Sequence, residues 1–329
     1  MHKTLTNENI LVTGGSGFLG SNLVENLNKH CDNVYSLTKN YNKTQKLYSF
    51  KKDITSKFIV GSITDVNEII RIIEDYKITI VYHLAANNNN IDSTEFYDIY
   101  ETNIRGTYSI IEACRHISSI KLLVFSSSEE VYSVLNNSSN QSDLYNPYTI
   151  SKSASELMLN RYSHDYNKNV AIVRMSNLYG EGDLNFRRLI PYLCDSIIHK
   201  HDFELRSTGK NLRDYLYIKD AVQAYAAITY IYLNQSLVGH HCFNLASEHR
   251  SSALEIVSIL KSIAIANGEP YESTLARIYT EDANERAGIQ YDLSKQKYLL
   301  DWKSTTTLSE GLNNTYIWYQ RYFDTYHLA

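Results

Sequence analysis

Short apolar runs alternate with amphipathic segments through the first half of the chain. The apolar runs are rich in Val, Ile, Leu and aromatic residues and fall at residues 9–13, 33–38, 58–61, 78–84, 122–126 and 170–174. Between them, apolar residues recur at spacings of three and four at residues 21–29, 66–75, 97–116 and 148–166. Strands that alternate with helices predict a parallel α/β sheet whose crossovers place helices on both faces.

Two of the predicted strands differ from the rest in their pattern. Residues 78–84 and 121–125 are apolar almost without interruption instead of alternating with polar positions. A strand covered by helices on both faces has this pattern. We therefore expect these two strands at the centre of the sheet.

Beyond Gly180 the regular alternation weakens. Helical patterns at residues 186–198, 220–232, 253–266 and 308–322 mix with isolated strands such as residues 241–245. We expect a main domain of residues 1–178, with returning segments near 210–245, and a smaller lobe formed mostly by residues 179–329. The aromatic C-terminal segment from Tyr316 to Phe323 is expected to pack as a helix on that lobe.

Composition narrows the class of protein. The 329 residues carry 32 Lys and Arg against 36 Asp and Glu, a net charge of -4, so nucleic acid is not an expected partner. Cys31, Cys114, Cys194 and Cys242 form no CxxC pair, and neither they nor the 11 His suggest a metal site. No apolar stretch approaches the ~20 residues of a membrane span, and no secretion signal is evident. The expected location is the cytosol, away from the membrane.

Four glycines lie in the seven-residue window Gly14 to Gly20, directly after the first predicted strand and before the first predicted helix. Glycines at this position permit a tight turn and let the backbone approach a pyrophosphate, while the helix N-terminus attracts the phosphates. The spacing of Gly14, Gly17 and Gly20 predicts a dinucleotide site, with Phe18 and Leu19 as further expected cofactor contacts.

The end of the second strand indicates which dinucleotide is bound. An acidic residue there binds the ribose 2′-OH, and its absence together with a nearby cation accommodates a 2′-phosphate. This strand ends Ser36-Leu37-Thr38-Lys39 without a carboxylate. Thr38 and Lys39 therefore favour NADP, with NAD as the alternative. Ser62 and Asp65 follow the third strand as adenine-side contacts, and Asp65 is equally suited to cap a helix.

Tyr148 and Lys152 are spaced i and i+4, which places them on one face of a helix. A nearby ammonium or an oxidised nicotinamide lowers the pKa of a phenol, which would let Tyr148 act as a base. Ser126-Ser127-Ser128 lies at the carboxyl end of a central strand, where sheets of this kind place reacting groups.

Taken with these residues, nearly the whole chain resembles the extended short-chain dehydrogenases/reductases, in particular the NAD(P)-dependent nucleotide-sugar epimerase/dehydratase family. The matching segments are Thr13 to Gly20, His83 to Ala86, Asn103 to Thr107, Ser127 to Tyr132, Tyr148 with Lys152, Arg174 to Gly180, Gly209 to Tyr215 with Asp220, and Asp292 to Lys295 before Trp302. The resemblance implies a Rossmann-type doubly wound α/β fold with a smaller C-terminal substrate-binding lobe.

The resemblance also implies roles for individual residues. Tyr148 would deprotonate the 4-OH of a nucleoside-diphosphate sugar, Ser128 would hydrogen-bond the same oxygen, and Lys152 would hold the nicotinamide ribose. Further expected cofactor contacts are Ser62, Ile63, Leu84, Ala85, Ala86 and Asn103. Asn177, Arg213 and, with a less secure alignment, Arg286 would grip the diphosphate of the substrate.

The pair after Ser128 separates the reactions of this family. In sugar 4,6-dehydratases both residues are acidic, the first protonating the departing 6-OH and the second removing the C5 proton, and Glu129-Glu130 meets that demand. Those enzymes carry Asp at the first position, a His-containing loop where this chain has Asn87 to Asn90, and Gly where it has Ser133. If the protein is not a dehydratase, Glu129 is expected to be a solvated acid in a loop.

Several alternatives stay open beside 4,6-dehydration. A 4-epimerase needs only Ser128, Tyr148 and Lys152, and the preference for NADP favours an NADPH-dependent 4-ketosugar reductase. A non-enzymatic dinucleotide-sensing protein would need neither the base nor its cation. Asn87 to Asn90 form either a polar loop or a lining of the cofactor cleft. The long helices that begin near Tyr97 and Tyr148 resemble a dimer-forming pair, so a homodimer is expected.

Overall fold

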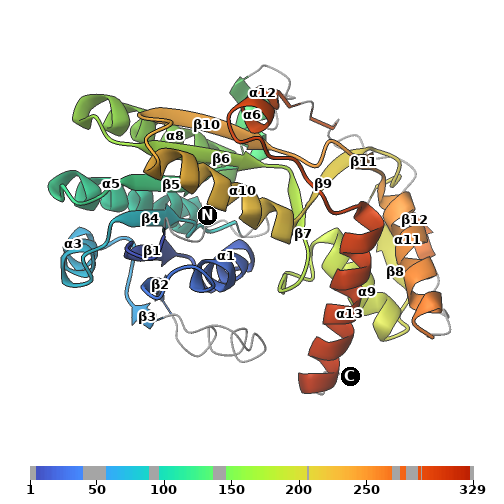
Figure 1. The fold of residues 1–329 in the computed structure, drawn as a ribbon. Helices are drawn as coiled ribbons and strands as arrows, with labels where there is room; N and C mark the ends of the chain where they lie inside the picture. Colours follow the sequence, from blue (N-terminus) through green and yellow to red (C-terminus); the bar gives the residue numbers. More distant parts are fainter. Residues whose placement is uncertain are drawn as a thin grey trace. The chain divides into compact units, whose positions relative to one another are not determined.

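Seven parallel strands form one sheet, in the order β10-β6-β5-β4-β1-β2-β3 (Figure 1). The strands are β1 (Ile10–Thr13), β2 (Val34–Thr38), β3 (Lys57–Val60), β4 (Ile80–His83), β5 (Leu122–Ser126), β6 (Val170–Met175) and β10 (His240–Leu245). The expected central strands correspond to β4 and β5, which are buried along their whole length and have neighbours on both sides. The predicted α/β parallel sheet is confirmed.

The computed structural model describes residues 5–39, 57–88, 96–135, 146–205, 207–268, 275–278, 288–289 and 291–326. The chain divides into two units, which we call the sheet unit and the small unit. The sheet unit comprises Met1–Met175, Val222–Leu245 and Asp292–Trp302, and the small unit comprises Ser176–Ala221, Ala246–Tyr291 and Lys303–Ala329. These are packing units, and the assignment of residues 1–178 and 179–329 to separate domains stays a prediction.

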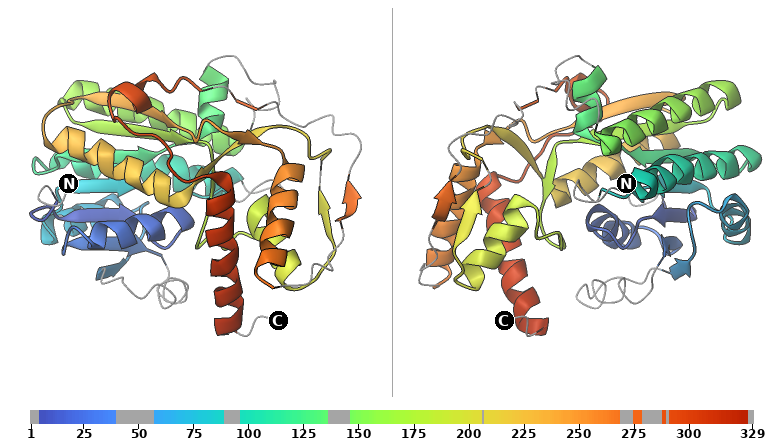
Figure 2. Two further views of the ribbon diagram at one scale, coloured as in Figure 1. Left: turned by 45° about the vertical axis from the view of Figure 1, so that its right-hand side comes forward. Right: turned by 180° about the vertical axis from the view of Figure 1, so that it is seen from behind.

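Helices cover both faces of the sheet. α3 (Val66–Asp75), α5 (Gly106–His116) and α8 (Pro147–Tyr166) pack side by side on one face, and α1 (Phe18–Asn28) and α10 (Ile218–Leu233) lie on the other (Figure 2). The core on the first face joins Ile69 and Ile73 of α3, Ile110 of α5 and Leu159 of α8 to the strands. The short helices α6 (Glu129–Leu135) and α12 (Ser294–Tyr298) complete this unit.

Local capping signals explain where the main helices begin. The Asp65 side chain accepts a hydrogen bond from the Glu68 N–H at the start of α3, so Asp65 is the helix cap. Asn146 caps α8 by accepting from the Tyr148 N–H, and Pro147 occupies the first helical position, where its missing N–H costs nothing. This cap fixes Tyr148 in the first turn of α8.

The structure corrects three expectations about elements. The helix expected over residues 97–116 is instead α4 (Phe96–Tyr100), a π-helical turn (Glu101–Arg105) and α5, because the wider turn lets the Asn103 side chain bond outside its own helix. The expected isolated strand at 241–245 is β10, the parallel partner of β6. α1 begins at Phe18 instead of residue 21, since its first turn includes Gly20.

The small unit is built around short strands and three helices. β7 (Asn177–Tyr179), β9 (Arg213–Tyr217) and β11 (Arg250–Ser251) form one sheet, and β8 (Phe203–Leu205) pairs with β12 (Leu275–Ile278). α9 (Leu189–Ile198), α11 (Ala253–Ala266) and α13 (Leu308–Tyr326) pack on one another. α13 buries Tyr316, Tyr319 and Phe323, as expected for the aromatic C-terminal segment.

None of the described helices combines the length and the apolar character needed to cross a lipid bilayer. The four cysteines are unpaired, and three of them are buried.

Candidate active site

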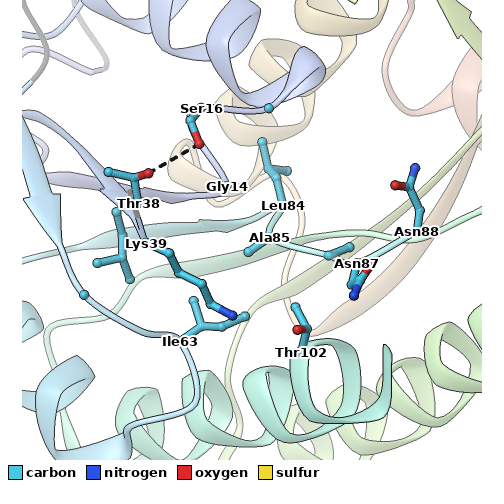
Figure 3. Close-up of a pocket in the computed structure, with 14 residues that line it drawn as sticks. Gly14, Ser16, Thr38, Lys39, Ile63, Leu84, Ala85, Asn87, Asn88 and Thr102 are labelled. Carbon is cyan, nitrogen blue, oxygen red and sulfur yellow. Dashed lines mark hydrogen bonds between the residues drawn. The ribbon is translucent and has the colours of Figure 1, made fainter. Parts of the chain in front are cut away.

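A cleft of about 390 Å³ lies at the carboxyl ends of β1, β2 and β4, in the sheet unit (Figure 3). β1 and β4 are neighbours in the sheet, and the chain leaves them toward opposite sides of it. Open parallel sheets bind ligands at such a switch point. The lining residues are Gly14, Ser16, Gly17, Leu37, Thr38, Lys39, Gly61, Ile63, Leu84, Ala85, Ala86, Asn87, Asn88 and Thr102.

The glycine turn is shaped by close backbone contacts. Gly14 has a φ of +72°, and a Cβ on it would lie 2.7 Å from the Ala85 nitrogen, so the turn after β1 packs directly on the chain that leaves β4. A Cβ on Gly20 would collide with the Gly14 carbonyl oxygen. The window therefore needs glycine at both positions to bring helix and strand together.

The start of α1 suits a diphosphate. Gly17 is the N-cap residue and has no side chain with which to cap the helix, and the first turn holds no acidic residue. The N–H groups there and the helix dipole favour an anion. The glycine turn, the start of α1 and the cleft together fit a bound dinucleotide, with Phe18 and Leu19 in the first helical turn.

Most of the predicted cofactor residues after the strand ends line the cleft. Those that do are Gly14, Gly17, Thr38, Lys39, Ile63, Leu84, Ala85 and Ala86, whereas Phe18, Leu19, Gly20, Ser62, Asn103, Tyr148 and Lys152 lie outside its lining. Asn87 and Asn88 line it, in agreement with the cleft-lining alternative. Sequence reasoning missed Ser16, Leu37, Gly61 and Thr102, although each is adjacent to a residue that it named.

His83, the last residue of β4, is hydrogen-bonded to one residue of β1 and one of α5. The Thr107 hydroxyl donates to the Asn103 carbonyl, so it accepts from His83 Nε2–H at 3.0 Å, and His83 Nδ1 is left to accept from the Thr13 hydroxyl at 2.8 Å. Burial, followed by the charge of Lys152, lowers the pKa of His83 to about 3. His83 is a neutral core histidine whose two ring nitrogens both have hydrogen-bond partners.

Asn103 connects the cleft to α8. Its side-chain amide donates to the Asn87 carbonyl at 3.0 Å and to the Ser151 hydroxyl at 2.9 Å, and its Oδ1 accepts from the Asn87 N–H. The Ser151 hydroxyl in turn donates to the Tyr148 carbonyl. The π-helical turn thus joins the loop after β4 to the first turn of α8.

Tyr148, Lys152 and Ser128 converge where β5 meets α8. Lys152 Nζ donates to the Ser126 carbonyl oxygen at 2.7 Å and lies 5.8 Å from the centre of the Tyr148 ring. Ser128 follows β5 by two residues, and its Oγ accepts from the Glu130 N–H at 3.2 Å. That contact uses a lone pair and leaves the hydroxyl hydrogen available to a ligand.

Lys152 is 2% exposed, which is unusual for a lysine. Burial disfavours the charged ammonium, and although Glu156 opposes this effect, the pKa of Lys152 falls to about 7. The ammonium therefore needs further acceptors to stay charged at neutral pH. Ribose hydroxyls are acceptors of that kind.

Glu129 and Glu130 form the first turn of α6, directly after Ser128. The Thr149 hydroxyl on α8 donates to Glu130 Oε2. Acids in a first helical turn are favoured by the helix dipole, so the position of the pair has a structural cause as well as a chemical use. Both carboxylates are partly exposed.

The predicted diphosphate contacts fall in the small unit. Asn177 begins β7 and is exposed, Arg213 begins β9, and the Asn177 amide donates to the carbonyl of Asp214 at 3.3 Å. Arg286 lies outside the described residues. Among the described residues, no group of three or more His, Cys, Asp or Glu is arranged to hold a metal ion.

A parallel sheet with this strand order, a glycine turn after β1 and a cleft at the switch point defines a Rossmann-type dinucleotide-binding protein. Residues 10–235 match the model of the NAD dependent epimerase/dehydratase family, and the chain belongs to that family. It is therefore an enzyme with a nicotinamide cofactor, as the sequence predicted.

Known proteins resemble the chain over nearly its whole length. dTDP-glucose 4,6-dehydratase of Haemophilus influenzae is 30% identical, with 94% of this chain and 97% of that protein aligned. The structure of dTDP-glucose 4,6-dehydratase from Bacillus anthracis in complex with NAD has a TM-score of 0.78 and 24% identity, covering 96% and 98% of the two chains. UDP-glucuronic acid 4-epimerase from Bacillus cereus has a TM-score of 0.79 and 24% identity, covering 95% and 99%. The two solved structures share the fold.

The lowered pKa of Lys152 predicts a pH-dependent term in stability. An unfolded lysine titrates near 10.4, so between about pH 7 and pH 10 the unfolded chain holds more protons at this site, and the term stabilises the fold as pH rises. The buried cysteines, whose pKa values are raised, oppose it above about pH 8.5. The cysteines are the same in wild type and in Lys152→Met, so their contribution cancels when the unfolding free energy of the variant is subtracted from that of wild type. This difference is expected to grow by about 1 kcal/mol per pH unit.

Urea unfolding of both proteins without cofactor, at several values between pH 7 and pH 9, measures this difference. A difference that stays constant across the range would show that Lys152 keeps an ordinary pKa in the folded protein.

Proposed function

We propose that the protein is a nucleotide-sugar 4,6-dehydratase that oxidises a nucleoside-diphosphate hexose transiently at C4. The observation that carries the proposal is the meeting of two elements: α6 supplies two carboxylates next to Ser128, and α8 supplies Tyr148 and Lys152. The 30% identity to a dTDP-glucose 4,6-dehydratase supports the same reaction.

In the proposed reaction Tyr148 takes the proton of the 4-OH while Ser128 donates a hydrogen bond to the same oxygen. A bound nicotinamide would supply the acceptor for the C4 hydride and, once water has left, the donor that returns this hydride to C6 while C5 regains a proton from Glu130. Glu130 takes the C5 proton, and the electron pair of that C–H bond forms the C5–C6 double bond as the 6-OH leaves. Glu129 gives the departing hydroxyl a proton, so water is released.

Lys152 places a positive charge near Tyr148 for this chemistry. Its hydrogen bond to the Ser126 carbonyl holds the ammonium near the Tyr148 ring, where a positive charge favours the phenolate. Substrate binding is assigned to Asn177, Arg213 and Arg286, since an amide and guanidinium groups suit a diphosphate.

Mass spectrometry tests the reaction on the purified protein incubated with UDP-, dTDP-, GDP- and CDP-glucose, with and without added NADPH. The expected product is lighter by one water and forms without added cofactor. Tyr148→Phe and Glu130→Gln should each lower its rate by about 10²-fold or more, because each removes a proton acceptor.

The matched control is Glu74→Gln, an exposed carboxylate near the end of α3, which should leave the rate unchanged. An isomer of unchanged mass would make the protein an epimerase and leave Glu129 and Glu130 as helix-cap acids. A reaction only with NADPH and a 4-ketosugar would make it a reductase. Biological activity that survives Tyr148→Phe would favour a dinucleotide-sensing protein.

For the cofactor we propose NADP in preference to NAD. Thr38 and Lys39 line the cleft at the end of β2, and the Thr38 hydroxyl lies 3.4 Å from that of Ser16 (Figure 3). No carboxylate lines the cleft among the described residues. Hydroxyls and a cation suit a 2′-phosphate, whereas a carboxylate would repel it.

Calorimetric titration with NADP⁺ and NAD⁺ tests this preference. Lys39→Ala should weaken NADP⁺ binding about tenfold and leave NAD⁺ binding unchanged, since only NADP⁺ carries the extra phosphate. Lys29→Ala, which removes an exposed lysine at the end of α1, is the control. Equal loss of affinity for both nucleotides would assign Lys39 to the shared pyrophosphate and leave NAD as the cofactor.

We also propose that the protein forms a homodimer through α4, α5 and α8. These helices expose large apolar side chains, namely Phe96, Tyr97, Tyr108, Ile150, Leu157 and Tyr166. Exposed apolar patches of this kind mark association surfaces. Sedimentation equilibrium should give twice the chain mass for wild type and a lower mass for Leu157→Glu. A monomeric wild type would refute the assignment.

A further inference from the structure

Thr149 is a buried threonine in the first turn of α8. It follows Tyr148 directly and is 1% exposed, so its hydroxyl has no access to bulk water. Successive helical residues point in directions about 100° apart. α8 therefore presents Tyr148 and Thr149 to two different neighbours from the same turn.

The neighbour of Thr149 is Glu130. Thr149 Oγ1 donates to Glu130 Oε2, while the Glu130 N–H donates to Ser128 Oγ. The carboxylate is thus bonded to α8, and the backbone of the same residue is bonded to the serine that ends β5. Two hydrogen bonds at opposite ends of one residue restrict where its carboxylate can lie.

A hydroxyl that donates to a carboxylate stabilises the ionised form. It also selects one oxygen as the anchored one, which leaves the lone pairs of the other oxygen directed elsewhere. A base that removes a carbon-bound proton must be ionised and must keep a fixed direction toward the C–H bond. The contact from Thr149 provides the fixed direction for Glu130.

We infer that Thr149 is a positioning residue that holds Glu130 ready to remove the C5 proton of the oxidised sugar. This inference rests on the dehydratase function proposed above. The proton moves from C5 to the Glu130 carboxylate. The electrons of the broken C–H bond form the C5–C6 bond as the 6-OH leaves with a proton from Glu129.

Other charged and titratable groups surround Glu130. α6 itself carries Glu129 and Tyr132. Of the elements packed against α6, α8 contributes Tyr148 and Lys152, and β6 contributes Arg174. Removing the Thr149 hydroxyl changes none of these charges. A change in the rate of proton removal would therefore report on the lost hydrogen bond.

The test measures deuterium incorporation at C5 when wild type and variants are incubated with dTDP-glucose and UDP-glucose in D₂O. In Thr149→Val the rate at neutral pH should fall about tenfold, because a hydrogen bond to a charged group is lost. Thr149→Ser restores the hydroxyl and should recover the rate to within about threefold.

Thr315→Val is the matched control. Thr315 is a fully buried threonine on α13 whose hydroxyl donates to the Gly311 carbonyl of its own helix. This variant should therefore keep the wild-type rate of deuterium incorporation. Thermal unfolding and calorimetric binding of dTDP check that each variant is folded. If Thr149→Val does not fold, Thr149→Ala removes the same hydroxyl without adding a methyl group.

The outcomes distinguish a failure of the dehydratase function from a failure of the role of Thr149. Wild-type enzyme that converts a sugar nucleotide without deuterium at C5, or that converts none of UDP-, dTDP-, GDP- and CDP-glucose, would overturn the dehydratase function and this inference with it. Wild-type incorporation together with an unchanged rate in Thr149→Val would overturn the role of Thr149 alone. Equal loss in Thr149→Val and Thr149→Ser would assign Thr149 to packing and also overturn it.

Discussion

Two buried side chains one turn apart on α8 are bonded to consecutive residues at the end of β5. Lys152 donates to the Ser126 carbonyl, and the Glu156 carboxylate accepts from the Ser127 hydroxyl. Because Tyr148 lies one turn before Lys152 and Ser128 follows Ser127, these bonds set where the proposed base lies relative to the proposed hydroxyl donor. The active site therefore depends on the register between this helix and this strand.

The register is stable only because its charges are matched. Glu156 is 7% exposed, and Arg174 of β6 binds both of its oxygens. A buried carboxylate without a partner would cost several kcal/mol. Lys152 lacks a comparable ion pair, and burial lowers its pKa. A ligand that offers hydroxyl acceptors to Lys152 would stabilise both the ammonium and the fold.

Local signals in the sequence predicted much of this arrangement. The bounds of β5, α3 and α11 agree with those expected, and the glycine window forms the turn after β1, because burial and capping act over a few residues. The π-helical turn at Asn103 could not be predicted, since the side chain of Asn103 bonds there to Ser151, 48 residues away. The pairing of β10 with β6 depends in the same way on residues far apart in sequence. The contact between Glu130 and Thr149 joins two predicted helices whose mutual placement no motif encodes.

The first turn of α6 shows why the reaction is harder to predict than the family. A serine followed by two glutamates is what a helix N-terminus favours by capping and by the helix dipole, whatever reaction the protein performs. The same three residues suit a dehydratase, so their occurrence in the sequence does not separate the two explanations. Capping needs only the backbone N–H groups of α6 and an oxygen of Ser128. It does not require the hydrogen bond from the buried Thr149 hydroxyl on a different helix, and the proposed role of Glu130 as a base would use this bond to aim the carboxylate.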